Sequence, residues 1–352
     1  MIIANYGRLT KTAHDPSTKS MDSIHFKVRN FIENKLLLPI PDDMSLLAPF
    51  ERLDLLNLAI RRYHAHVPFH NILLMSQPPE KRRLPTLDEL VDDVVSGRGG
   101  RCYTDNNCFK IALECLGFES YLAASTFFPP NSHVIIGVRN VLVDGDLYLV
   151  DGGCGLPFFS AIAMDFDSES PTQKDSHCKH KVVKRSGTKG DSYPTYERWI
   201  ERTSGFGGQP ISPDDSRGED NDWFRLYHFT MEERDFEFFA PFISPLYLNP
   251  PALGPFHTMI LISLFPDGKR ATFKSVISID EETNEKIRKF VLIMEQEEGK
   301  PVKETFLVDD EMQFERSLEI AGKLFVPLQN WLRDAFVNFK NLEIGDVGLN
   351  TT

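Results

Sequence analysis

Residues 97–118 read GRGGRCYTDNNCFKIALECLGF, and the fold is organised around this stretch. The glycines at its start predict a flexible turn, and the residues after Cys102 carry the apolar spacing of an amphipathic helix. Gly117 is a typical residue to end that helix, because glycine adopts the left-handed conformation of a helix C-terminus without strain. The apolar side of the helix consists of Phe109, Ala112, Leu113 and Leu116. The stretch therefore predicts a glycine turn leading into a helix with a cysteine at its start.

Cys102 lies where the exposed N–H groups of a helix N-terminus favour a thiolate over a thiol. The thiolate is the nucleophilic form of cysteine, so the position suits covalent catalysis. A lone cysteine is more often a small packing residue, and the residues alone leave both interpretations open. Cys108, Cys115 and Cys154 are interpreted as packing residues.

A candidate base and a group to orient it follow downstream. After Gly117 the pattern changes to the strands YLAAS, HVIIGV and DLYLVDGG, with His133 at the start of the second and Asp151 near the end of the third. If these last two strands form a hairpin that turns near residues 140–145, His133 lies beside Asp151. Strand alternation points Asp151 inward, where a carboxylate needs a partner such as an imidazole. The alternative, that Asp151 only begins the DGG turn, stays open on spacing alone.

The other segments complete an α+β pattern. Helices are predicted over residues 53–66, 84–95, 314–325 and 327–339, and a β-hairpin around residues 266–268. Thr86 and Glu89 have the spacing of a capping box. Residues 1–20 predict a flexible tail. Residues 165–222 are rich in Ser, Asp, Lys, Gly and Pro with little periodicity, which indicates a long surface excursion, partly disordered.

Composition bounds the class of protein. The chain has 352 residues, 41% hydrophobic and 26% charged, as in an ordinary globular protein. A net charge of −12 supplies no basic excess for nucleic acid or an anionic membrane surface, so neither is expected as a partner. No apolar run reaches the ~18 residues of a membrane span, and the first residues lack a signal-peptide pattern. Five cysteines do not make a disulfide framework, so a cytoplasmic protein is expected. The sequence does not indicate an oligomeric state.

Several segments resemble the arylamine N-acetyltransferase family. GRGGRC resembles its Arg-Gly-Gly-x-Cys box, SHVIIGV its histidine strand, and LYLVDGGCG its Val-Asp-x-Gly-x-Gly box. HVPFHNI, at residues 66–72, resembles its Val-Pro-Phe-Glu-Asn segment, and PFHTMILISLFPDGKRATF resembles a later hairpin. Boxes in a fixed order are more specific than any one motif. The size and the central insertion look most like the larger fungal members, some of which are N-malonyltransferases.

The resemblance implies a three-part α+β fold with a papain-like Cys-His-Asp core. Residues 21–118 would form a helical domain that carries the nucleophile. Residues 119–245 would form a β-barrel domain with the insertion near 165–222, and residues 246–352 an α/β lid.

The resemblance also implies a chemistry. Cys102, His133 and Asp151 would form a catalytic triad. Acetyl- or malonyl-coenzyme A, as a co-substrate, would acylate Cys102, and the thioester would pass its acyl group to an aromatic amine in ping-pong order, a reaction that detoxifies xenobiotics or plant toxins. No permanently bound cofactor and no metal is implied. The implied acceptor contacts are Phe127, Phe128 and Phe69, although ordinary packing is the alternative for one of the first two. The implied donor contacts are Arg101, Pro130, Asn131, Ser132, Phe256 and Thr258.

Three positions depart from the family pattern. Thr104 stands where Glu or Gln is usual. His70 replaces a glutamate that can pair with the arginine of the glycine box, which is Arg98 here. The ionic support that this glutamate gives Arg98 must therefore be rebuilt by another residue or lost. Arg101 stands where bacterial relatives commonly carry an aromatic residue. An arginine beside the nucleophile suits a donor with a free carboxylate such as malonyl-coenzyme A; the alternative is that Arg101 points to solvent or only assists the coenzyme phosphates.

Other classes of protein remain as alternatives. A papain- or transglutaminase-like cysteine hydrolase uses Cys, His and Asp in the same order, but it accepts water or peptide substrates and needs no coenzyme A. A metal protein is suggested by two clusters, which we interpret as structural or surface residues; no carboxylate or cysteine completes the first set at an obvious spacing. The clusters are His64, His66 and His70, and His177, Cys178 and His180. An inactive binding module would normally lose a triad residue, and none is lost.

Overall fold

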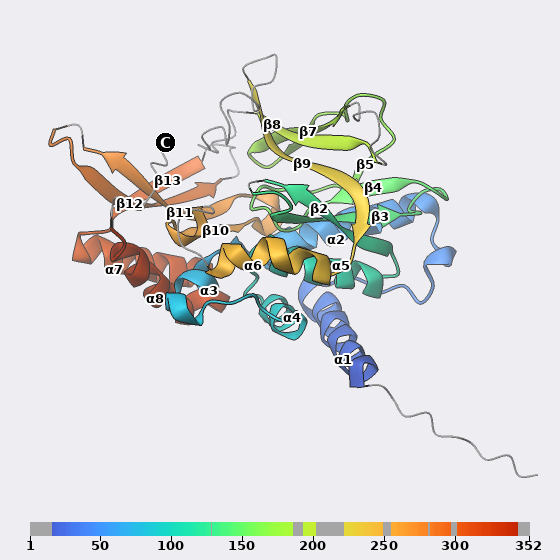
Figure 1. The fold of residues 1–352 in the computed structure, drawn as a ribbon, viewed down its shortest axis with the longest axis horizontal. Helices are drawn as coiled ribbons and strands as arrows, with labels where there is room; N and C mark the ends of the chain where they lie inside the picture. Colours follow the sequence, from blue (N-terminus) through green and yellow to red (C-terminus); the bar gives the residue numbers. More distant parts are fainter. Residues whose placement is uncertain are drawn as a thin grey trace, which may run out of the picture.

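A helical region, a large antiparallel sheet and a smaller sheet backed by helices make up the chain (Figure 1). The computed structural model describes residues 16–127, 129–185, 193–201, 222–248, 255–280, 282–296 and 301–343. The predicted α+β, three-part fold class is confirmed. In the parts of the chain that the structure describes, no helix has the length and apolar character needed to span a membrane.

Helices form the first of these parts. They are α1 (Pro16–Phe31), α2 (Pro49–His66), α3 (Ile72–Met75), α4 (Leu87–Val95) and α5 (Cys102–Cys115). Thr86 caps α4 with the predicted capping box, in which the Thr86 N–H donates to the Glu89 carboxylate at 2.8 Å. Because α1 begins at Pro16, the predicted tail of residues 1–20 is wrong for residues 16–20, and the rest of that tail lies outside the described residues.

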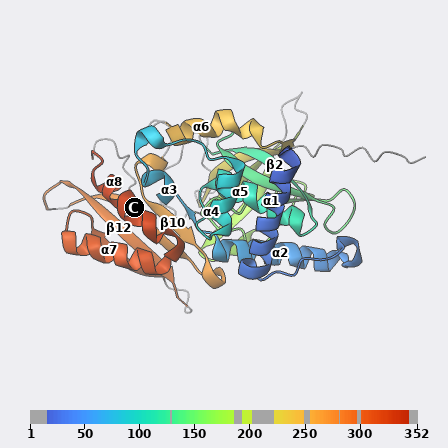
Figure 2. The same ribbon diagram turned by 90° about the horizontal axis from the view of Figure 1, so that it is seen from below.

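Helix α5 is packed on several sides, against α1, α2, α4 and the strands that follow it (Figure 2). Most of its residues are buried, including the polar Asp105, Asn106 and Asn107. Gly117, one residue beyond its C-cap, has φ of 95°, a left-handed conformation that glycine adopts without strain. The predicted helix and its glycine stop are confirmed, and the burial fixes Cys102 at its start in a rigid element.

An eight-stranded sheet follows, in the order β5-β4-β3-β2-β9-β8-β7-β6, with antiparallel pairing throughout. Its strands are β2 (Glu119–Thr126), β3 (His133–Arg139), β4 (Leu147–Val150), β5 (Ile162–Ala163), β6 (Gln173–Asp175), β7 (Cys178–Arg185), β8 (Thr195–Glu201) and β9 (Trp223–Arg234). One face packs on the helices through Val134 and Ile136, and the other encloses a second apolar cluster with Ile135 and Leu149. Since β5 and β6 are its two edges, the described sheet is curled and open rather than a closed barrel.

The predicted surface excursion at 165–222 is the largest correction to the sequence analysis. Residues 173–175, 178–185 and 195–201 are strands β6, β7 and β8, which extend the large sheet beyond β9. Strand β8 reads TYERWIE and is mostly buried, because its neighbours on both sides are strands. Residues 186–192 and 202–221 of the same stretch lie outside the described residues. The segment therefore contributes side chains to the interior of the molecule.

The smaller sheet has the order β1-β10-β11-β12-β13 and is backed by two helices (Figure 1). Its elements are β1 (Phe69–His70), β10 (Leu261–Leu264), β11 (Ala271–Ile279), β12 (Lys286–Glu295) and β13 (Pro301–Leu307), with α7 (Glu311–Leu324) and α8 (Gln329–Lys340) behind. Phe273 stacks on Phe336 of α8, Phe290 packs on the same ring at a tilt, and together they fill the core between sheet and helices. The predicted β10–β11 hairpin and the two C-terminal helices are confirmed. Helix α6 (Ala240–Leu248) lies between β9 and β10 in the chain.

Candidate active site

Cys102, His133 and Asp151 lie together where α5 meets the large sheet. Strands β3 and β4 pair as an antiparallel hairpin, with Ile136 opposite Val150, so the first residue of β3 lies near the residue that follows β4. The His133 Nε2 atom is 3.0 Å from Asp151 Oδ2, and both side chains are buried. The His133 imidazole also shares a hydrogen bond with the Cys102 thiol.

Charge in this cluster favours a thiolate–imidazolium pair. Burial by itself raises the pKa of Cys102, but the His133 imidazolium, its hydrogen bond and the nearby Arg101 bring the pKa below its ordinary value. Burial by itself lowers the pKa of His133, but the Asp151 carboxylate and the Cys102 thiolate raise that pKa to about 10. These two opposite shifts favour a thiolate paired with an imidazolium over a neutral thiol paired with a neutral imidazole.

Asp151 has further partners that the sequence analysis did not single out. Asn106 donates to Asp151 Oδ1 at 3.0 Å, and the Tyr227 hydroxyl donates to Oδ2 at 2.8 Å. Arg198 Nη1 lies 3.5 Å from Oδ2 and 3.0 Å from the Cys154 sulfur. Burial by itself raises the pKa of Asp151, but His133, Arg198 and Asn106 hold it below its usual range. Asp151 therefore stays ionised although it is fully buried.

Gly153 allows the chain after β4 to approach the nucleophile. A Cβ atom at Gly153 would lie 3.0 Å from the Cys102 Cα and 3.0 Å from the Asn106 amide nitrogen. The neighbouring Gly152 N–H donates to Asn106 Oδ1 at 2.8 Å. The DGG sequence is thus required by close packing against α5, as well as by the position of the carboxylate.

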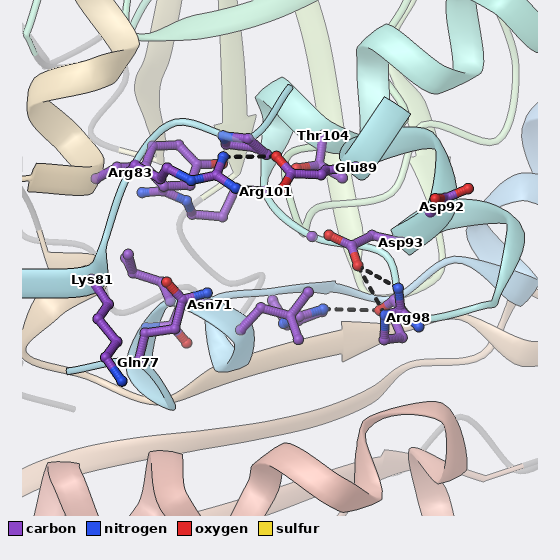
Figure 3. Close-up of a pocket in the computed structure, with 16 residues that line it drawn as sticks. Asn71, Gln77, Lys81, Arg83, Glu89, Asp92, Asp93, Arg98, Arg101 and Thr104 are labelled. Carbon is purple, nitrogen blue, oxygen red and sulfur yellow. Dashed lines mark hydrogen bonds and ion pairs between the residues drawn. The ribbon is translucent and has the colours of Figure 1, made fainter. Parts of the chain in front are cut away.

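The arginine of the glycine box has a different carboxylate partner from the one the family pattern predicts. Arg98 Nη2 lies 2.7 Å from Asp93 Oδ1, at the end of α4 (Figure 3). His70 accepts a hydrogen bond from the Ile72 N–H at Nδ1, so its Nε2–H donates to the Arg98 carbonyl at 2.9 Å. Mainly through burial, the pKa of His70 is lowered to about 4. The support is therefore rebuilt: Asp93 supplies the charge, and a neutral His70 holds the backbone.

Restoring the family's glutamate at this position is expected to destabilise the protein. In the variant His70→Glu, an ionised carboxylate would face the Arg98 carbonyl, where two acceptors cannot form a hydrogen bond. We expect the free energy of unfolding to fall by roughly 2–4 kcal/mol, measured by denaturant titration. His66→Glu, on an exposed end of α2, serves as the control and is expected to change it by less than about 1 kcal/mol. A neutral or stabilised His70→Glu variant contradicts the assignment of Asp93 as the partner of Arg98.

Three of the predicted binding residues lie near the nucleophile. Arg101 immediately precedes Cys102, and its guanidinium carbon is 5.4 Å from the centre of the Phe256 ring. Phe256 makes an edge contact with Phe69, whose ring centroid is 6.1 Å away. The Phe69 strand β1 is held against the glycine turn, because the His70 N–H donates to the Gly100 carbonyl at 2.7 Å.

Ser132 also lies near the nucleophile, since its carbonyl is 3.8 Å from the Cys102 sulfur. The remaining predicted binding residues lie in different surroundings. Asn131 has φ of 54° and donates its N–H to the Thr126 hydroxyl, while Pro130 is exposed. Thr258 is buried in the smaller-sheet region. Phe127 packs against the apolar cluster on the far face of the large sheet, and Phe128 lies outside the described residues.

Arg101 does not point to solvent, so that alternative is wrong. It is 5% exposed, its Nη1 donates to the Leu246 carbonyl at 3.1 Å, and its guanidinium carbon is 3.7 Å from the Tyr247 ring centre. Its Nη2 has no hydrogen-bond partner within the described chain. Arg101, Arg98 and Tyr247 also line a cavity of about 380 Å³ beside the glycine turn, which the triad residues do not line (Figure 3).

The two histidine clusters do not converge on a metal position. Among the described ranges, no group of three His, Cys, Asp or Glu side chains could hold a metal ion. His64 Nε2 lies 3.4 Å from the Phe158 N–H, and His177 stacks on Phe265. His180 pairs with Asp175 at 2.9 Å, which makes a second buried His–Asp pair in the large sheet.

Comparison with known proteins places the chain in a family. A family model described as N-acetyltransferase matches residues 52–312, well over half of the chain. The chain belongs to the arylamine N-acetyltransferase family. No curated protein sequence matches it significantly.

Solved arylamine N-acetyltransferases share its fold. The enzyme from Mycobacterium abscessus is 15% identical, with 94% of this chain and 100% of that chain covered and a TM-score of 0.61. The Mycobacterium marinum enzyme, in complex with CoA, is 16% identical, with 89% and 98% covered and a TM-score of 0.59. The Bacillus cereus enzyme, which has a Cys-His-Glu catalytic triad, is 18% identical, with 85% and 97% covered and a TM-score of 0.56. At these identities the likeness concerns the fold alone.

Proposed function

We propose that this protein is an acyl-coenzyme A-dependent arylamine N-acyltransferase that works through a thioester on Cys102. The observation that carries the proposal is the continuous contact from the Cys102 thiol to His133 and on to the buried Asp151 carboxylate, at the start of a rigid helix. Family membership and the CoA complex of the similar M. marinum structure support the choice of donor.

The proposed chemistry has two half-reactions. The Cys102 thiolate attacks the thioester carbonyl, coenzyme A leaves, and the His133 imidazolium gives its proton to the departing sulfur. The amine then attacks the Cys102 thioester, neutral His133 takes the proton released by the amine nitrogen, and the thiolate leaves as the amide forms. Asp151 orients the imidazole and stabilises its charged form throughout. One thioester replaces another in the first half-reaction, so little free energy is lost before the amine binds.

The amine dependence of coenzyme A release tests this function against the hydrolase alternative. With acetyl-coenzyme A alone, we expect a single burst of free thiol equal to the enzyme concentration, followed by slow release. Adding an aromatic amine is expected to start continuous release, with ping-pong kinetics. Steady release at the same rate without amine would instead identify a thioester hydrolase.

For the acceptor, we propose an aromatic amine held against the Phe69 ring, beside the proposed donor contact Phe256, with which Phe69 makes an edge contact. The preference of aromatic rings for edge-to-face and offset packing supports this proposal. Phe127 and Phe128 remain proposed acceptor contacts from the family resemblance. Detoxification of such amines in the cytoplasm, as in the larger fungal members, is the proposed biological setting.

For the donor, we propose that Arg101 favours an acyl group with a free carboxylate, such as malonyl. Its buried guanidinium next to Cys102, with one nitrogen unpartnered, supports this choice over acetyl. We expect Arg101→Ala to lower the acylation rate with malonyl-coenzyme A roughly tenfold more than the rate with acetyl-coenzyme A. Stopped-flow measurement of both acylation rates, in wild type and variant, checks this. An unchanged donor ratio contradicts a role for Arg101 in donor choice.

A further inference from the structure

One arginine of the central segment, residues 165–222, reaches the triad. Arg198 lies on β8, is fully buried, and forms an ion pair with Asp151, with Nη1 3.5 Å from Oδ2. It pairs with Tyr227 of β9, while the next residue, Trp199, pairs with Arg225, so β9 has one extra residue here. Strand bulges of this kind are common next to active sites, where they redirect a side chain.

Arg198 contacts the same carboxylate oxygen as the imidazole. His133 Nε2 lies 3.0 Å from Asp151 Oδ2, and the Tyr227 hydroxyl donates to that oxygen at 2.8 Å. Asn106 donates to the other oxygen, Oδ1. A positive charge at the shared oxygen weakens the negative potential that the carboxylate creates at the imidazole. Arg198 therefore opposes the pull of Asp151 on the His133 proton.

The guanidinium has Asp151 as its counter-ion. In the described ranges, no other carboxylate forms an ion pair with Arg198. Its further contacts are the Cys154 sulfur at 3.0 Å, the Pro157 carbonyl at 3.3 Å and the Phe158 ring, whose centre is 3.9 Å away. Burial raises the pKa of the Cys154 thiol far above its ordinary value, so this sulfur carries no charge. An arginine stays protonated in proteins, so its charge acts on Asp151 throughout the reaction.

Other titratable groups face the cluster from the elements packed against it. Mainly through burial, the pKa values of the Asp105 carboxyl and the Tyr227 hydroxyl are raised well above their ordinary values. Burial also lowers the pKa values of His64 and His180 to about 4. Each of these shifts favours the neutral form. Three further groups approach the cluster: Arg101 near Cys102, the Cys178 thiol near Arg198, and Asp175, which bonds His180.

The charges of the four groups in contact balance in both states of the proposed cycle. In the free enzyme, the Cys102 thiolate and the Asp151 carboxylate face the His133 imidazolium and the Arg198 guanidinium. In the acyl-enzyme the sulfur is a neutral thioester, so the guanidinium alone balances the carboxylate and His133 is neutral. If the guanidinium were absent, an imidazolium would replace it as counter-ion, because an unpaired buried charge is costly.

We infer that Arg198 is a positioning residue for the second half-reaction: it balances the Asp151 carboxylate in the acyl-enzyme and so keeps His133 neutral, ready to take a proton from the incoming amine. The inference rests on the proposed function. It gives a role in the reaction to a segment whose composition indicated a surface excursion.

The protons and charges of this step balance. The amine nitrogen forms a bond to the thioester carbon and gives one proton to His133, and the carbon–sulfur bond breaks to release the Cys102 thiolate. The products are the amide and the thiolate–imidazolium pair of the free enzyme. An imidazole that is already protonated in the acyl-enzyme cannot accept this proton, so the amine step is the one that depends on Arg198.

Separate rates of the two half-reactions test the inference. Arg198→Gln removes the charge and keeps an amide donor. We expect the acylation rate, measured by stopped flow as the burst of free coenzyme A, to stay within about threefold of wild type. For transfer from the acyl-enzyme to an aromatic amine, we expect the midpoint of the pH profile to rise by about one pH unit, with a roughly tenfold lower rate on its acidic limb. Arg198→Lys is expected to restore most of that rate.

A neighbouring arginine provides the matched control. Arg225, on β9, lies 3.0 Å from Glu197 in another ion pair of the same sheet, and Arg225→Gln is expected to change neither half-reaction. An unchanged midpoint in Arg198→Gln overturns the inference, and so does an equal loss in both half-reactions, which would show a structural role. If Arg198→Gln does not fold, Arg198→Met, an uncharged side chain of similar length, takes its place in the same measurement.

A second measurement does not depend on acyl transfer. Alkylation of Cys102 with iodoacetamide gives a thioether that is uncharged, like the thioester. NMR titration of the alkylated proteins, with the His133 signal identified by its absence from His133→Gln, is expected to give a His133 pKa about one pH unit higher in Arg198→Gln than in wild type. Equal pKa values overturn the inference. If wild type forms no acyl-enzyme, the proposed function fails, and this titration still decides the effect of Arg198 on His133.

Discussion

Asp151→Asn is expected to lower kcat/KM for acyl transfer roughly 10³- to 10⁴-fold. The substitution keeps the shape of the side chain but removes the charge that, against the effect of burial, raises the pKa of His133. Without that charge the pKa of His133 falls. The Cys102 thiolate then loses its imidazolium partner, and the pKa of Cys102 rises. The remaining activity is therefore expected to move to higher pH, which a pH profile of kcat/KM measures.

The chain offers a matched control for this variant. Asp175 forms a second buried pair with His180, at 2.9 Å, compared with 3.0 Å between Asp151 and His133. Asp175→Asn removes the carboxylate of a buried His–Asp hydrogen bond from the same sheet, away from the nucleophile, and is expected to keep kcat/KM within about threefold of wild type. Equal losses in both variants would mean that Asp151 acts only through folding.

Cys102→Ala is expected to remove acyl transfer, with a loss of at least about 10⁴-fold in kcat. The other two thiols of α5 cannot replace it, since burial raises the pKa of Cys108 far above its ordinary value and the pKa of Cys115 to about 11. Cys115→Ala, on the same helix, is the control and is expected to retain activity. Normal turnover by Cys102→Ala would refute a covalent mechanism at this residue.

The elements that the sequence predicted well are those fixed by local spacing. The capping box at Thr86, the helix after Cys102 and the Gly117 stop depend on residues a few positions apart. The proximity of His133 and Asp151 also follows from a short hairpin, because antiparallel pairing brings the start of one strand beside the end of the next. These contacts need no knowledge of the rest of the fold.

The residues behind Asp151 depend on longer-range pairing and were missed. Arg198 and Tyr227 lie opposite each other on β8 and β9, and β8 comes from a stretch whose composition suggested a surface excursion. No local pattern tells that a strand of mixed polarity will be enclosed by strands on both sides. Asn106 could have been found, because it lies four residues after Cys102 and so shares its side of α5.

The departure at His70 shows a second limit of motif reasoning. The family pattern indicated a lost carboxylate, but the replacement, Asp93, comes from the end of α4 and lies only five residues from Arg98. The Asp93 side chain had no special pattern around it, since an acidic residue near a helix end is usually solvated. The structure was needed to identify the pair.

Intact-protein mass after brief exposure to acetyl- or malonyl-coenzyme A, without amine, tests the central claim most directly. We expect one added acyl group on wild type, none on Cys102→Ala, and loss of the adduct when an aromatic amine is added. No adduct with either donor, or an adduct that persists in Cys102→Ala, would contradict an acyl-enzyme on Cys102.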